Sequence, residues 1–171
     1  MLKISSRGHY GLRLMTSLAG AYGKGPMSLT EVARVDAMPL PYLEQLVVPL
    51  RKAGLVLGTR GLHGGYTLPR DPKEISAGAI LRVLEGPVSL VDCTALDYLP
   101  GACEREGECL SSGLWHRIKV TVEAILNATT LDDLLHDPGF QPGVAQLPAS
   151  FASLPGVRVL AVPRGPAMSG D

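Results

Sequence analysis

Residues 28–68 constrain the fold of this chain more than any other stretch. The stretch opens with Ser28, and Glu31 follows three positions later, which is the spacing of a helix that caps its own first turn. Two short segments with apolar residues at helical spacing come next, and only residues 36–38 separate them. We therefore expect two helices joined by a tight turn.

The second of these helices has an apolar face and a more polar face. Its apolar residues recur at helical intervals and predict a buried stripe made of Leu43, Leu46, Val47 and Leu50. The opposite face holds Pro41, Gln45, Val48 and Lys52. Pro49 lies inside the pattern and lacks the N–H that would bond the Gln45 carbonyl, so we expect a bend between these two residues.

Two β-prone segments, residues 55–57 and 66–68, follow a glycine that can end the second helix. The tip between them contains the run Thr-Arg-Gly-Leu-His-Gly-Gly. A backbone this rich in glycine can press against a phosphate or the wall of a DNA groove, while Arg60 reaches inward. The expected fold class is therefore mainly α with a small β-wing, a winged helix-turn-helix followed by a long helix.

A helix-turn-helix commonly places its second helix in the major groove of DNA. Near the start of that helix, Gln45 can pair with adenine and Glu44 can accept a hydrogen bond from cytosine. The residues that we expect to contact DNA are Ser28, Pro39, Pro41, Tyr42, Glu44, Gln45, Arg51, Arg60, His63, Gly64 and Gly65. Arg7 and Arg13, near the start of an earlier helix, either contact phosphate or face solvent. The alternative for the whole stretch is a packed helical module that binds no nucleic acid.

Charge is distributed unevenly along the chain, although the formal net charge is zero. Residues 1–70 hold 9 Lys and Arg against 3 Asp and Glu, whereas residues 71–171 hold 7 against 13. Binding to a polyanion depends on the local charge rather than on the net charge. The first part of the chain can therefore face DNA, and the remainder need not.

Helical periodicity also appears outside residues 28–68. After a capping Ser5 or Ser6, one apolar stripe consists of Leu14, Leu18 and Tyr22. A second stripe, after Ser76, consists of Ile80, Val83 and Leu84. A third stripe, after Gly113, consists of Leu114, Ile118, Val122 and Ile125. Thr130 and Asp133 predict a last short helix, and the proline- and glycine-rich residues 137–171 predict a tail with little regular structure. The expected organisation is a DNA-binding domain (1–86), a cysteine-bearing loop (87–112), a helical segment (113–136) and the tail (137–171).

The three cysteines of the chain, Cys93, Cys103 and Cys109, fall within 17 residues of one another. An odd number in one loop argues against a framework of structural disulfides. Thiolates ligate iron–sulfur clusters and zinc alike, and the spacing alone does not choose between them.

Features of an enzyme or of a membrane protein are absent from the sequence. It contains no Gly-x-Ser-x-Gly nucleophile motif and no Cys-x-x-Cys pair. No apolar run approaches the roughly 20 residues that span a bilayer, and the start lacks the apolar core of a secretion signal. We therefore expect a cytoplasmic protein that is not an enzyme.

Residues 41–56 (PYLEQLVVPLRKAGLV) and 60–68 (RGLHGGYTL) resemble the recognition helix and wing of one family of regulators. This family is the Rrf2 superfamily of bacterial transcription regulators, which includes the IscR, NsrR, RirA and CymR types. The likeness extends from Ile4 to about Leu135 and includes residues 75–86 (ISAGAILRVLEG). The wing departs from the family pattern, because Leu62-His63 stands where such proteins usually carry Pro-Gly.

The resemblance implies a homodimer in which the helix after Gly113 crosses its symmetry mate. A two-fold dimer would match a pseudo-palindromic operator in double-stranded DNA. The resemblance also implies that Cys93, Cys103 and Cys109 hold an iron–sulfur cluster with two or four irons. The first interval between the cysteines is longer here than in the commoner family arrangement. No membrane partner is implied.

The resemblance further suggests where a fourth cluster ligand would come from. IscR-type members use a histidine shortly after the third cysteine, where this chain has Ser112. His9 stands where NsrR-type members bring a carboxylate from the partner subunit, and His116 lies on the following helix. The implied function is a regulator that senses iron–sulfur status, redox state or nitric oxide. The alternative is the same DNA-binding dimer controlled by zinc, by thiol chemistry or by a protein partner.

Overall fold

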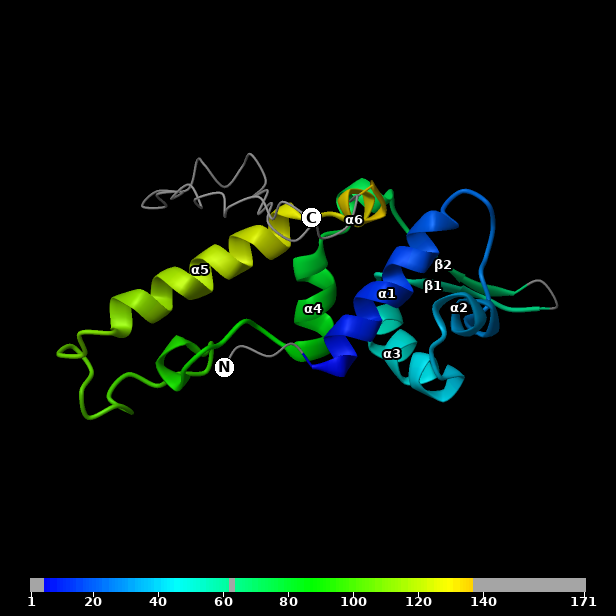
Figure 1. Ribbon diagram of the computed structural model, residues 1–171. Coiled ribbons are helices and arrows are strands. Elements are labelled where there is room, and N and C mark those ends of the chain that lie inside the picture. Colours follow the sequence, from blue (N-terminus) through cyan, green and yellow to red (C-terminus); the bar gives the residue numbers. More distant parts are fainter. Residues whose placement is uncertain (1–4, 62–63, 137–171) are drawn as a thin grey trace, which may run out of the picture. The chain divides into compact units, whose positions relative to one another are not determined.

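The computed structural model describes residues 5–61 and 64–136, and within them the chain is mainly helical with a small two-stranded sheet (Figure 1). In chain order the elements are α1 (Ser6–Gly20), α2 (Leu29–Asp36), α3 (Leu40–Lys52), β1 (Leu57–Thr59), β2 (Gly65–Thr67), the 3-10 turn η1 (Pro72–Glu74), α4 (Ala77–Glu85), the 3-10 turn η2 (Asp92–Thr94), α5 (Ser112–Ala128) and α6 (Leu131–His136). The expected fold class is confirmed. His63 and the expected tail lie outside the described residues.

Hydroxyl and carboxylate side chains cap α1, α2, α4 and α6 at the positions that the sequence indicated. Ser5, Ser28 and Ser76 each accept a backbone N–H from the first turn of the helix that follows, at 3.1, 3.1 and 3.2 Å respectively. At α6 the caps are reciprocal, because the Asp133 carboxylate accepts from the Thr130 N–H at 2.8 Å and the Thr130 hydroxyl accepts from the Asp133 N–H at 3.1 Å. These bonds satisfy backbone donors that a helix cannot satisfy itself.

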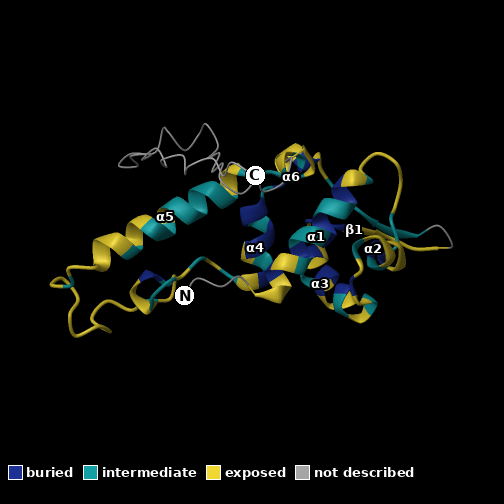
Figure 2. Ribbon diagram, in the orientation of Figure 1, coloured by how far each residue is buried: buried dark blue, intermediate teal, exposed yellow. Residues whose placement is uncertain are grey.

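The core lies where α1, α3 and α4 meet, and Figure 2 shows buried residues on each of these helices. The fully buried members include Leu14, Met15 and Leu18 of α1, Leu43, Leu46 and Leu50 of α3, and Ile80 of α4. The expectation for Tyr22 was wrong. The helix ends at Gly20, so Tyr22 falls in the turn beyond it and remains 43% exposed.

The α3 helix carries its expected buried stripe and continues through Pro49 as one segment. The bend that we expected at Pro49 does not interrupt the helix. Its carboxyl end is followed by Gly54 with φ +70°, a left-handed conformation that favours glycine and stops the helix.

The wing is shifted along the sequence from its expected position. Leu55 and Val56 were expected in the first strand, but they are buried in the core, and β1 begins only at Leu57. The antiparallel register pairs Leu57 with Thr67 and Thr59 with Gly65. The chain ahead of α2 joins this sheet. Met27 exchanges two backbone hydrogen bonds with Tyr66, at 2.8 and 3.0 Å.

The α5 helix contacts α4 and η2, yet none of its residues is buried. Its apolar stripe at Leu114, Ile118, Val122 and Ile125 is half-buried or exposed (Figure 2). At its carboxyl end, the Ala77 N–H of α4 donates to the Thr129 carbonyl at 2.8 Å. Gly78 lies so close to Asn127 that an added Cβ would come within 2.3 Å of its side-chain oxygen. Among the described residues, none of the helices is both long and apolar enough to cross a membrane.

Candidate DNA-binding surface and cysteine-lined site

The face of α3 opposite the core is open to solvent along the whole helix. Its exposed residues are Pro41, Glu44, Gln45, Val48, Arg51 and Lys52. Glu44 and Gln45 lie within the first two turns, and the buried Leu43 and Leu46 beside them hold the helix against α1 and α4. A rigid helix with polar and basic side chains on its outer face is suited to entering a DNA groove.

Tyr42 is less available than its neighbours on α3. Its ring is half-buried and packs edge-on against the ring of Tyr10 on α1, with centroids 5.5 Å apart and planes at 83°. Aromatic edge-to-face pairs stabilise packing beyond the area they bury. Tyr42 therefore joins the start of α3 to α1, in addition to any contact that it makes with DNA.

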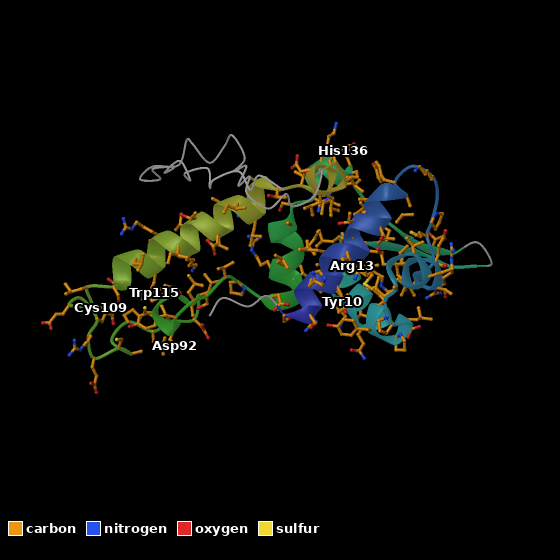
Figure 3. The ribbon with its side chains drawn as sticks, viewed as in Figure 1. Tyr10, Arg13, Asp92, Cys109, Trp115 and His136 are labelled. Atoms are coloured by element: carbon orange, nitrogen blue, oxygen red, sulfur yellow. The ribbon has the colours of Figure 1, made fainter. Side chains whose placement is uncertain are left out.

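The turn between α2 and α3 is held by side chains from α1. The Arg13 guanidinium donates to the Asp36 carbonyl oxygen and lies 3.8 Å from the Asp36 carboxylate. The Ser17 hydroxyl donates to the other carboxylate oxygen. The sequence left Arg13 open between a phosphate contact and a solvated face, and the structure gives it an intrachain role. Figure 3 shows Tyr10 and Arg13 on α1 beside α3.

Several residues that we expected to contact DNA also have a role in the fold of the chain. The Ser28 hydroxyl accepts the Glu31 N–H as the cap of α2. A Cβ added to Gly65 would lie 2.6 Å from the Met27 carbonyl oxygen, and one added to Gly64 would lie 2.4 Å from the Thr59 carbonyl oxygen. Close backbone approach therefore already requires both glycines. Pro39 and Arg60 are exposed, at the start of α3 and just after β1.

The three cysteines line one open concavity beside the amino end of α5, with a volume of about 730 Å³. Cys93 lies in η2 and Cys103 in the following loop, and both are exposed. Cys109 is half-buried just before α5, and Figure 3 labels it there. Tyr98, Glu106 and His116 line the same concavity. His9 is exposed on α1, with its ring 5.4 Å from the ring of Tyr10, and does not belong to this lining.

Local hydrogen bonds shape the backbone around the cysteines. The Thr94 hydroxyl donates to the Val91 carbonyl at 2.8 Å and closes the turn that carries Cys93. Lys119 of α5 donates to the Thr94 carbonyl at 2.7 Å and ties this turn to the long helix. The Glu106 carboxylate accepts the Tyr98 hydroxyl at 3.0 Å. Desolvation and this nearby carboxylate raise the pKa of the Tyr98 hydroxyl.

Polar groups lie close to the Cys109 thiol. Its sulfur lies 3.3 Å from the Ser111 hydroxyl. This hydrogen bond lowers the pKa of the Cys109 thiol, and the backbone N–H groups of Ser111 and Ser112 act in the same direction. A lowered pKa favours the thiolate, which is the form that binds metals.

The side chains that line the concavity are suitable ligands for a soft metal, but they do not lie close enough together to bind one. Three thiols and one imidazole on a single concavity match the ligands that iron–sulfur clusters and zinc prefer. Within the described residues, no group of three or more His, Cys, Asp or Glu side chains is close enough to hold a metal ion. The chemistry of the donors therefore fits such a group, and binding would require the loop to bring the sulfurs closer together.

Comparison with known proteins places the whole described region in one family. A family model for Rrf2, described as an iron-dependent transcriptional regulator, matches residues 4–137. The transcriptional regulator CymR of Bacillus subtilis strain 168 is 47% identical over 133 residues, which cover 78% of this chain and 89% of that protein.

Solved structures agree with this assignment. The structure of CymR, described as the global cysteine regulator of B. subtilis, aligns with a TM-score of 0.65 and 46% identity, covering 80% of this chain and 98% of that one. The structure of T. potens IscR aligns with a TM-score of 0.64 and 39% identity, covering 81% and 89%. These relatives are regulators and not enzymes, as expected for this chain. The chain therefore belongs to the Rrf2 family of DNA-binding transcriptional regulators.

Proposed function

We propose that this protein is a homodimeric regulator that binds a pseudo-palindromic DNA site and responds to an iron–sulfur cluster held by Cys93, Cys103 and Cys109. The observation that carries the proposal is the position of the cysteine-lined concavity at the amino end of α5. The carboxyl end of that helix is hydrogen-bonded to α4, and α4 packs on both α1 and α3. A change at the cysteines thus has a continuous path of packed helices to the exposed face of α3.

The proposed DNA interface consists of α3 and the wing. Glu44 and Gln45 would read base edges, because their side chains are exposed near the amino end of a helix that the core holds rigidly. Arg51 and Arg60, both exposed, would neutralise phosphates on either side. Pro39, Pro41 and the glycine-rich tip would contact the backbone of the DNA.

The proposed dimer forms through α5. A helix of 17 residues with an apolar stripe and no buried residue is incomplete by itself. Pairing with the same helix of a second copy would cover Ile118, Val122 and Ile125 and would place two α3 helices on one DNA duplex.

The proposed cluster would supply one-electron chemistry and sensitivity to oxygen or nitric oxide. The three cysteines would bind it as thiolates. His116 is the fourth candidate within the chain, because it lines the same concavity. His9 would have to reach the site from the partner subunit. Regulation then requires that the cluster favour one of two dimer conformations, since a ligand shifts an equilibrium only by its differential affinity for the two states.

The test is anaerobic purification followed by measurement of iron and sulfide per chain and of the visible absorption spectrum. Each single Cys→Ala variant should lose the colour while keeping its helix content, because all three cysteines lie outside the core. The exposed Ala102→Ser, next to Cys103, is the matched control that alters the loop without removing a thiol. If a variant kept its full content of iron and sulfide, the cysteine that it lacks would not be a ligand of the cluster. A colourless protein containing zinc would overturn the cluster proposal and leave the DNA-binding proposal standing.

The fourth ligand is tested by His116→Ala and His9→Ala in the same anaerobic protein. Loss of the true ligand should alter the absorption or circular dichroism of the cluster and make it more labile to oxygen. If His9 is the ligand, the operator affinity of the His9→Ala variant should in addition no longer depend on whether the cluster is bound. Unchanged spectra in both variants would exclude both histidines.

A further inference from the structure

Asp36, the last residue of α2, accepts hydrogen bonds from two side chains of α1. Arg13 donates to its backbone carbonyl and lies 3.8 Å from its carboxylate, and Ser17 donates to the second carboxylate oxygen. The Asp36 side chain is only 21% exposed. An acidic group at the carboxyl end of a helix faces the negative end of the helix dipole, so it needs such partners to be stable there.

The conformation of the next residue, Ala37, shows why these contacts to Asp36 matter for the turn. Ala37 has φ +51° and ψ +46°, and it is the single non-glycine residue with positive φ among those described. The left-handed conformation costs an ordinary residue about 1–2 kcal/mol, so surrounding contacts must hold it in place. Met38, which follows, is buried, and Pro39 is the N-cap of α3, which begins at Leu40. The direction of α3 therefore depends on the geometry at Asp36 and Ala37.

The same guanidinium is linked to the start of α3 through the ring of Tyr10. Arg13 lies 5.8 Å from the centroid of the Tyr10 ring, and Tyr10 packs edge-on against Tyr42 in the first turn of α3. One side chain thus touches the end of α2 directly and the start of α3 through one ring. Arg13 is therefore connected to both helices that the turn joins, α2 and α3.

We propose that Arg13 is a positioning residue for sequence-specific DNA recognition, which sets the direction in which α3 presents Glu44 and Gln45. This inference rests on the proposed function of α3. We assign Arg13 a role inside the chain because its guanidinium donates to the Asp36 carbonyl and lies 5.8 Å from the centroid of the Tyr10 ring. Displacing α3 disrupts contacts to base edges, which are directional, far more than the attraction to phosphates, which is not.

The discriminating variant is Arg13→Lys. Lysine keeps the positive charge but lacks the planar fork that addresses a carbonyl and a carboxylate together. We expect binding to a selected operator to weaken about 10-fold, the equivalent of one base-reading contact, with unchanged binding to random DNA. The dependence of affinity on salt should also stay unchanged. Wild-type affinity in Arg13→Lys, or a flatter salt dependence in Arg13→Ala, would overturn the proposal and indicate a phosphate contact.

A double-mutant cycle supplies the second readout. If Arg13 works through Asp36, the loss of operator affinity in Arg13→Ala combined with Asp36→Ala should be close to that of either single variant. Additive losses would contradict the proposal. The exposed Arg34→Lys on α2 is the matched control and should bind as wild type does. Melting temperatures identify any variant that fails to fold. In that case Arg13→Lys and Asp36→Asn replace the two alanine variants in the double-mutant cycle.

The proposed function of the protein and the positioning role of Arg13 are tested separately. If the wild-type protein selects no DNA sequence, the proposed function fails. If the wild type is selective and Gln45→Ala is defective while Arg13→Lys is not, only the positioning role of Arg13 fails.

Discussion

The carboxylate of Glu85, the last residue of α4, accepts the backbone N–H of Gly8 in the first turn of α1 at 2.6 Å. The same oxygen accepts the hydroxyl of Ser5, the cap of that helix. A negative charge at the amino end of a helix satisfies orphan N–H groups and complements the helix dipole. The next two residues, Gly86 and Pro87, lead into the cysteine-bearing loop, so the start of that loop is anchored to the start of α1.

Glu85→Gln should therefore destabilise the fold. We expect the free energy of unfolding to fall by about 0.5–1 kcal/mol, the usual size of a helix-end interaction with a charged side chain. Urea denaturation followed by circular dichroism measures it. Glu74→Gln, on the exposed turn η1, is the matched control. Equal stability of the two variants would show that the Glu85 charge contributes nothing at this helix end.

Gly65→Ala should be among the most damaging small substitutions in the wing. The new Cβ would lie 2.6 Å from the carbonyl oxygen and 2.7 Å from the carbonyl carbon of Met27, which are backbone atoms that cannot rotate away. We expect a loss of about 1–3 kcal/mol of stability, as for other overpacked sites. Gly113→Ala is the control, because no atom lies within 4 Å of its added Cβ. Thermal unfolding of both variants decides the matter, and equal melting temperatures would refute the close approach.

Asp133 should make the stability of the chain depend on pH. Hydrogen bonds from the Thr130 hydroxyl, and then from its backbone N–H, lower the pKa of the Asp133 carboxyl in the folded protein. The stabilisation is therefore complete above the ordinary carboxyl pKa and is lost as the pH falls through the lowered folded value. Asp133→Asn should cost about 0.5–1 kcal/mol at pH 7, the size of a capping bond, and progressively less in acid. Urea titrations across this range test it, with the exposed Asp97→Asn as control.

Gln45→Ala should weaken binding to a selected operator by about 1–3 kcal/mol and change binding to random DNA little, because a base contact carries sequence information. Arg60→Ala is the contrasting variant. It should weaken binding to both DNAs and reduce the slope of affinity against salt by about one charge. Fluorescence anisotropy at several salt concentrations measures both. Equal losses of Gln45→Ala on the two DNAs would exclude base reading by this residue.

Ile118→Lys should disrupt the proposed dimer, because it places a charge in the apolar stripe of α5. Val120→Lys is the matched control, since Val120 projects from the other side of the helix and is 48% exposed. Sedimentation velocity should show a monomer for the first variant and a dimer for the second. A wild-type protein that sediments as a monomer would refute dimerisation through α5.

Local patterns predicted the elements well, and tertiary contacts explain the differences. Ser28, Ser76 and the Thr130–Asp133 pair cap helices where the sequence places them, because capping involves only near neighbours in the chain. The shift of β1 had no local signal. Leu55 and Val56 suit a strand, but the core buries them instead.

The role of Arg13 depended on a partner in another helix, and composition around Arg13 gave no indication of it. One signal was nevertheless present. Asp36 is an acidic residue at the carboxyl end of an expected helix, where the dipole disfavours it, and that position calls for a cation nearby in space. Similarly, Gly64 and Gly65 were assigned to DNA contact, whereas their distances to backbone atoms of Thr59 and Met27 supply a reason within the chain.

The pairing of Met27 with Tyr66 joins the wing and the start of α2 into one cooperative unit. Opening of the wing as far as Tyr66 requires breaking the two hydrogen bonds to Met27, so this part of β2 should not separate independently of the segment that enters the helix-turn-helix. The amide hydrogens of Met27 and Tyr66 should consequently exchange with solvent at similar rates. A DNA groove that displaces Tyr66 would then also act on Met27, the residue just before the Ser28 cap of α2.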